Sequence, residues 1–72
     1  MPAPFQSATG VVASFDDHRG DGAIAVDDGT ILPFHCTQIA DGSRRIEVGS
    51  AVRFTTVAGR AGRWEAGGIE PS

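Results

Sequence analysis

The sequence predicts an all-β fold in which five short strands close into a small antiparallel barrel. Three observations support this prediction. Residues 19–39 hold two alternating runs on either side of an Asp-Gly turn, which is typical of a β-hairpin. Ten glycines in 72 residues, with few helix formers in sequence, favour strands and turns. A chain this short would bury too little apolar surface as a two-layer sandwich, whereas a closed sheet has one core and no edges.

The domain is expected to span residues 9–70. Before it, residues 1–8 have two prolines and small residues and are expected to form a disordered tail. The first strand is predicted at residues 9–15, and a polar turn at residues 16–20 leads into the hairpin.

The hairpin at the centre is predicted from residues 22–26 and 31–36. Each run alternates, so one face of each strand should enter a core while the other stays outside. Asp27-Asp28-Gly29-Thr30 joins them as a tight turn, because Asp-Gly tolerates the positive φ that such turns require. The predicted core, which draws on all strands, is Val12, Ile24, Val26, Leu32, Phe34, Ile39, Ile46, Val52, Phe54 and Ile69.

The rest of the chain supplies the last two strands. They are predicted at residues 51–57 and 64–69, joined by a glycine-rich basic loop, AGRAGR, at residues 58–63. The remaining segments are a loop or short helical turn at 37–43, a connector at 44–50 and a short C-terminal tail at 71–72.

Charge is divided unevenly along the chain. All six cations are arginine, against nine carboxylates, for a net charge of −3. Six Asp and one Arg precede residue 43, for about −5, whereas five Arg and three Glu follow, for about +2. Proteins that bind phosphate backbones usually carry a basic stripe. Any such surface must therefore be built mainly from the second part of the chain.

Several classes of protein fit the sequence poorly. Cys36 is the only cysteine, which excludes an internal disulfide and suits a cytoplasmic compartment. No secretory signal or apolar span is found, so we expect no membrane association. His35 and Cys36 are neighbours on a strand and should point to opposite faces, which argues against a nucleophile–base pair.

Metal binding and cofactor binding are not expected either. The acidic turn containing Asp16, Asp17, His18 and Asp21 lacks the ligand spacing of calcium loops, and a solvated turn explains it better. The chain has no zinc spacing and no phosphate-cradling motif. The prediction is a protein without enzymatic activity, metal or cofactor.

Three segments together resemble a known family. Residues 9–15, TGVVASF, are similar to an opening strand of the form Gly-x-Val-Lys-Trp-Phe. Residues 19–24, RGDGAI, and 32–36, LPFHC, occupy two ribonucleoprotein-type motifs, Lys-Gly-Phe-Gly-Phe-Ile and Val-Phe-Val-His-Phe. On these motifs the chain resembles the cold-shock domain family over about residues 9–69. The resemblance implies a five-stranded barrel of the oligonucleotide-binding fold that binds single-stranded nucleic acid.

The resemblance also implies that much of the family's aromatic binding platform has been replaced. Only Phe15 and His35 remain as rings, and Arg19 keeps a cation where the family has lysine. Because stacking is worth roughly 1–3 kcal/mol per base, binding should be weak. The positions at which the family has aromatic side chains are Ser14, Asp21, Ala23, Pro33 and Cys36.

The leading hypothesis is therefore a monomer that weakly captures single-stranded RNA or DNA, by residual stacking and arginine–phosphate contacts. The alternative is a structural or protein-interaction barrel that has lost this binding and uses its acidic hairpin face on a protein partner. A continuous positive strip favours the first hypothesis, and an acidic patch over Asp21 and Ala23 favours the second. The candidate nucleic-acid-binding residues are Phe15, Arg19, His35, Arg44, Arg45, Arg60, Arg63 and Trp64.

Four of these candidates also have structural interpretations. Phe15 belongs to the core if the first strand bends sharply. Arg19 is expected to pair with a neighbouring carboxylate, from Asp17 or Asp21. His35 is either a base contact or a solvated strand residue. Trp64 is either a relocated platform in the basic loop or a lid on the barrel, and its large contribution to burial favours the lid.

Overall fold

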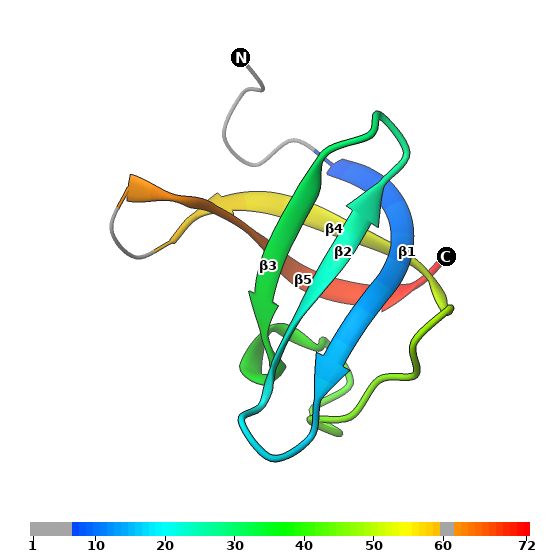
Figure 1. Cartoon of the computed structure of the whole chain (residues 1–72), viewed down its shortest axis with the longest axis vertical. Coiled ribbons are helices and arrows are strands. Elements are labelled where there is room, and N and C mark those ends of the chain that lie inside the picture. Colours follow the sequence, from blue (N-terminus) through cyan, green and yellow to red (C-terminus); the bar gives the residue numbers. More distant parts are fainter. Residues whose placement is uncertain (1–6, 60–61) are drawn as a thin grey trace.

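The computed structural model describes residues 7–59 and 62–72 and contains one antiparallel sheet of five strands, in the order β3-β2-β1-β4-β5 (Figure 1). The elements are β1 (Ser7–Asp16), β2 (Asp21–Val26), β3 (Ile31–His35), the 3₁₀ turn η1 (Cys36–Gln38), β4 (Ala51–Ala58) and β5 (Trp64–Pro71). The all-β prediction with five strands is confirmed. β1 begins two residues earlier than predicted, and residues 1–6 of the expected tail lie outside the described residues.

The sheet is not closed into a barrel, so that part of the prediction is wrong. The strand order leaves β3 and β5 as the two edges, although the sheet curls so that they approach each other (Figure 1). β3 ends at His35, where the chain turns into η1. Beyond that turn, a single parallel bridge joins Ile39 to Ile69, and Ala40 N donates to Ile69 O at 2.7 Å.

A proline protects the open edge of β3. Val26 N donates to Thr30 O at 2.8 Å, and Cys36 N donates to Gly20 O at 2.7 Å, which sets the alternation of backbone groups along the hairpin. By that alternation the backbone of Pro33 faces away from β2. Proline lacks an N–H, so the edge offers an incoming strand one donor fewer.

The core lies inside the curl of the sheet, and the predicted set is confirmed. Most of its members are buried, and Val26, Leu32 and Ile46 are partly buried and pack against the others. Sequence alternation missed Ala66 and Thr56, which are buried at 0% and 6% exposure. Among the described residues, the buried hydrophobic side chains are Val12, Ile24, Phe34, Ile39, Val52, Phe54, Ala66 and Ile69.

A β-bulge in β1 turns Phe15 inward. The pairing of β1 with β2 shifts between Val12 and Ser14, so Ala13 is an extra residue. Strict alternation from the buried Val12 would place Phe15 outside; the extra residue reverses this. Phe15 is partly buried and packs against the core, as the structural interpretation of this residue predicted.

Gly22 lets two aromatic rings meet across the inner face. Phe15 and Phe34 lie opposite Gly22 on either side of it and stack with ring centroids 5.9 Å apart and an interplanar angle of 3°. A Cβ on Gly22 would collide with Ser14 O and come within 2.8 Å of Phe34 Cζ. The glycine is required because the stacked rings occupy the space that a side chain needs.

Helical structure is limited to short turns in the described part of the chain. η1 falls within the loop or short helical turn predicted at residues 37–43. None of the described helical segments has the length and apolar character needed to cross a bilayer.

Candidate nucleic-acid interface

The outer face of β1, β2 and β3 is built from rows of residues that pair across the strands. Asp21 and Ala23 lie on this face, two residues apart, with Asp21 directly opposite His35. One row contains Asp16, Asp21 and His35, and the next contains Ser14, Ala23 and Pro33. The imidazole of His35 is the one aromatic ring in these two rows, so the face offers little surface on which bases can stack.

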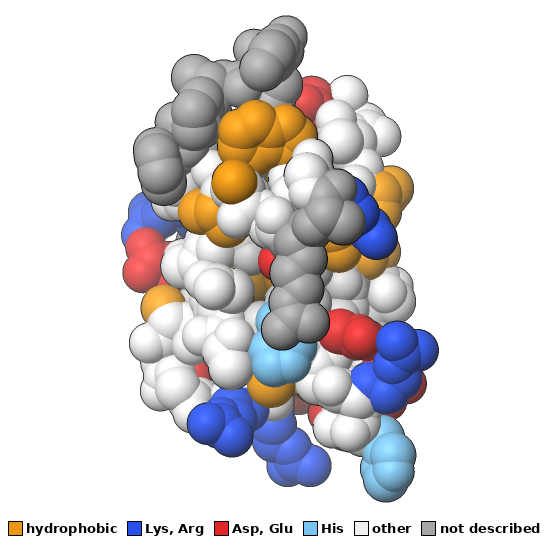
Figure 2. All heavy atoms as spheres, turned by 90° about the vertical axis from the view of Figure 1, so that its left-hand side faces the viewer, with side chains coloured by type: hydrophobic (Ala, Val, Ile, Leu, Met, Phe, Trp, Pro, Cys, Tyr) orange, Lys and Arg blue, Asp and Glu red, His pale blue; other side chains and the backbone are white. Residues whose placement is uncertain are grey.

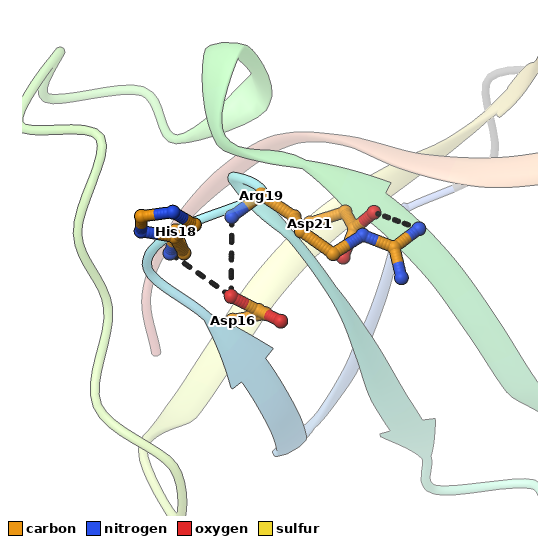
Figure 3. A network of polar contacts seen from close by, with 4 residues as sticks. All are labelled: Asp16, His18, Arg19 and Asp21. Carbon is orange, nitrogen blue, oxygen red and sulfur yellow. Dashed lines mark hydrogen bonds and ion pairs between the residues drawn. The ribbon is translucent and has the colours of Figure 1, made fainter.

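Arg19 and Asp21 form an exposed ion pair at one end of this face (Figure 3). Arg19 Nη2 lies 3.4 Å from Asp21 Oδ2, with side chains 73% and 45% exposed. This confirms the expected pairing of Arg19 with a neighbouring carboxylate. Such a pair contributes at most about 1 kcal/mol, so Arg19 can exchange its partner for a phosphate group, but Asp21 opposes the approach of a polyanion.

Asp16 stabilises the turn that carries Arg19. Its Oδ1 accepts hydrogen bonds from His18 N at 2.9 Å and from Arg19 N at 3.1 Å (Figure 3). The carboxylate is therefore part of the turn. Across residues 7–59 and 62–72, no cluster of histidine, cysteine and carboxylate side chains is arranged to hold a metal ion.

His35 is exposed and caps η1. Its Nδ1 accepts a hydrogen bond from Thr37 N at 3.3 Å and lies 3.0 Å from Thr37 Oγ1. The turn thus orients the imidazole at the end of β3. His35 is thus an exposed residue of β3, as the interpretation of a solvated strand residue predicted, and it also caps the turn. Its contact with a base stays a prediction.

The expected separation of His35 from Cys36 is wrong. Cys36 Sγ lies 3.9 Å from His35 Nδ1, because the strand ends at His35 and the 3₁₀ turn begins at Cys36. The alternation of a regular strand therefore does not extend to this pair. The sulfur also packs against Gly20, where a Cβ would lie 2.9 Å from Sγ, and Cys36 contacts the core.

A groove of about 650 Å³ lies between β3, η1 and the start of β5. It brings together two of the predicted residues, His35 and Arg63, which are far apart in the sequence. It is lined by Asp21, Gly22, Pro33, Phe34, His35, Thr37, Gln38, Arg63 and Glu65. Sequence reasoning missed Phe34, Thr37, Gln38 and Glu65 as groove residues, because only the curl of the sheet carries the start of β5 next to β3.

The charge of this groove is mixed. Arg63 can contact a phosphate group, but the carboxylates of Asp21 and Glu65 line the same walls. Figure 2 shows that the arginine side chains of this face lie towards its margins, where two of them adjoin in this view, and that acidic side chains lie near some of the others. On the described part of this face the positive charge forms no continuous strip.

Arg44 and Arg45 do not line this groove. Arg44 and Arg45 lie on the loop between η1 and β4, where Arg44 has a φ of 59°. Arg45 lines a different hollow of about 440 Å³, which also involves Ile46 and Ile69. Arg60 lies outside the described residues.

Trp64 begins β5 and pairs with Ala58, next to the turn of the β4–β5 hairpin. Its side chain is partly buried. Among the described residues it is not one of the hydrophobic side chains that pack against the core. The favoured interpretation of Trp64 as a lid is therefore not supported.

A family model described as the 'Cold-shock' DNA-binding domain matches residues 8–71. No curated protein matches the chain.

Proposed function

Because the chain belongs to the cold-shock domain family, which binds nucleic acid and is not enzymatic, we propose that it binds single-stranded RNA or DNA weakly, in the groove between β3 and β5. The observation that carries this proposal is the meeting of His35 with Arg63 in one groove. An imidazole and a guanidinium that line one groove suit a base and a phosphate group of the same strand.

Weak affinity follows from the composition of the groove. Phe34 lines it but is buried at 2% exposure, so it cannot offer a free ring face to a base. The carboxylates of Asp21 and Glu65 repel phosphate groups, whereas Arg63 attracts them. Most of the attraction should therefore come from arginine–phosphate contacts, which depend strongly on salt.

The proposal is tested by replacing Arg63 with alanine. We expect Arg63→Ala to weaken binding to an unstructured oligonucleotide several-fold and to reduce the salt slope by about 0.7, the value for one phosphate contact on a single strand. His35→Ala should weaken binding less, because it removes a stacking contact and leaves the arginine–phosphate contact in place. Fluorescence anisotropy of a labelled oligonucleotide over a series of salt concentrations measures both quantities.

Arg53 provides the matched control for this experiment. It is exposed on β4, forms an ion pair with Glu70 and does not line the groove. Arg53→Ala should therefore leave affinity and salt slope close to those of the wild type. Tight binding that is indifferent to salt would contradict the proposal, as would equal losses in the two arginine variants.

A further inference from the structure

We propose that the outer face of β1, β2 and β3 docks an extended protein segment that carries cationic and small apolar side chains. This inference goes beyond nucleic-acid binding and concerns a surface that adjoins the groove. The surface, called the outer hairpin face below, is formed mainly by Val11, Ala23, Ala25, Ile31 and Pro33, with Ser14 in the same row as Ala23 and Pro33.

The outer hairpin face is continuous and apolar. Val11 lies opposite Ala25, which lies opposite Ile31, so the three side chains form a row across the strands. Val11 is 42% exposed and Ile31 is 59% exposed. A second row through Ala23 and Pro33 lies beside it. Exposed apolar side chains gathered on one sheet face favour contact with another surface.

The side chains of this face project only a short way from the sheet, because most of them are small. Adjacent strands lie about 4.8 Å apart, so three strands span roughly 10 Å. This width accepts one extended segment but is too small for a large permanent interface. Binding should therefore be transient and depend on charge for much of its specificity.

Carboxylates flank the apolar rows at both ends. Asp27 and Asp28 lie in the β2–β3 turn, next to Val11 and Ile31 in the fold, and Asp16 and Asp21 lie at the opposite end. The hydrogen bonds that Asp28 accepts from Thr30 lower the pKa of its carboxyl group, so this group is ionised at neutral pH.

Arginine does little to balance these carboxylates. In the span from β1 to η1, Arg19 is the one arginine, and it already pairs with Asp21. On the neighbouring strand β4, Arg53 lies opposite Thr9 of β1 but pairs with Glu70. The outer hairpin face therefore presents an apolar centre between two negative ends.

This charge pattern selects the occupant. A nucleic acid would bring its phosphates against Asp27 and Asp28 at one end and Asp16 at the other. A second copy bound face to face about a two-fold axis would place acidic ends against acidic ends. A segment with arginine or lysine at its ends and small apolar residues between them matches both the acidic ends and the apolar centre of the face.

The probe is a short synthetic peptide that alternates arginine with alanine and valine, and the control peptide has glutamate in place of arginine. Each is titrated into the full chain while backbone amide chemical shifts are followed. We expect saturable shifts in the two apolar rows for the cationic peptide and none for the acidic one. Shifts confined to the groove, around Gln38 and Glu65, would overturn the proposal.

Two pairs of matched variants test charge and apolar contact separately. Asp28 and Asp41 are both exposed, and each accepts a 2.8 Å hydrogen bond from the backbone N–H two residues later, which asparagine preserves. Asp28→Asn should weaken peptide binding about two- to five-fold, as expected for an exposed ion pair, and Asp41→Asn should not. Equal affinities for the two variants would overturn the charge argument.

Ile31 and Val48 form the apolar pair, with 59% and 61% of their surface exposed. Ile31→Thr should weaken peptide binding several-fold, whereas Val48→Thr, on the loop before β4, should leave it unchanged. Both replacements stay β-branched, so strand propensity is preserved.

An oligonucleotide titration of the same sample separates this proposal from the proposed function. If the oligonucleotide changes the amide chemical shifts of groove residues and the peptide changes those of the outer hairpin face, both proposals are supported. Oligonucleotide shifts centred on Val11 and Ile31 would make nucleic acid the occupant and overturn the docking proposal. Concentration-dependent self-association through these residues would overturn it in favour of a second copy.

Discussion

Replacing Asp21 and Ala23 together by phenylalanine should tighten single-strand binding at least ten-fold. Both side chains lie on the outer face of β2, beside His35 and Pro33 of β3. The double change adds two rings, each worth roughly 1–3 kcal/mol per stacked base. It also removes a carboxylate and releases Arg19 from its ion pair. Affinity is measured for wild type and variant on one oligonucleotide at fixed salt.

Thermal melts of both proteins are the control for folding. Neither Asp21 nor Ala23 belongs to the buried core, so the variant should melt cooperatively. A folded variant with unchanged affinity would show that this face does not bind nucleic acid even when two rings are restored on it. The same variant should bind the cationic peptide less well. It loses the carboxylate of Asp21, and two large rings would project from a face that otherwise carries small side chains.

Phe34→Ala should leave most of the population unfolded at room temperature. Phe34 is 2% exposed, stacks on Phe15 and belongs to the core cluster. Truncating a buried phenylalanine costs about 3–5 kcal/mol, which rivals the whole stability of a domain with so small a core. Urea unfolding followed by circular dichroism measures the loss.

Ile31→Ala on the same strand is the matched control, because Ile31 is exposed and should change stability little. Gly22→Ala provides an independent test of the ring stack. The added methyl group would collide with Ser14 O and press on Phe34 Cζ, so this variant should also unfold. A stable, cooperative Phe34→Ala protein would contradict the assigned packing.

The central hairpin was predictable because its determinants are local. Gly29 adopts a φ of 93°, and Gly29 N donates to Val26 O, as expected for a turn with glycine at the left-handed position. Alternation then placed Ile24 and Phe34 in the core. Each of these predictions depends on neighbouring residues and on the period of a strand.

The candidate site was predictable only in part. The motif positions correctly placed Asp21 and Ala23 on one face beside His35. The sequence did not indicate that Arg63 shares a groove with His35, because 27 positions separate them and no local pattern connects them. The roles of Arg44, Arg45 and Arg60 in binding remain predictions.

The sequence by itself determined the strands, the hairpin turn and most of the core. These depend on backbone preference and on the alternation of side chains, which act over a few residues. The tertiary structure decided the open edge of β3, the inward turn of Phe15 at the Ala13 bulge and the groove that joins β3 to β5. These depend on how a curled sheet packs around one core. An extra residue or a short turn reverses or ends the alternation, and only contacts between distant segments determine where that happens.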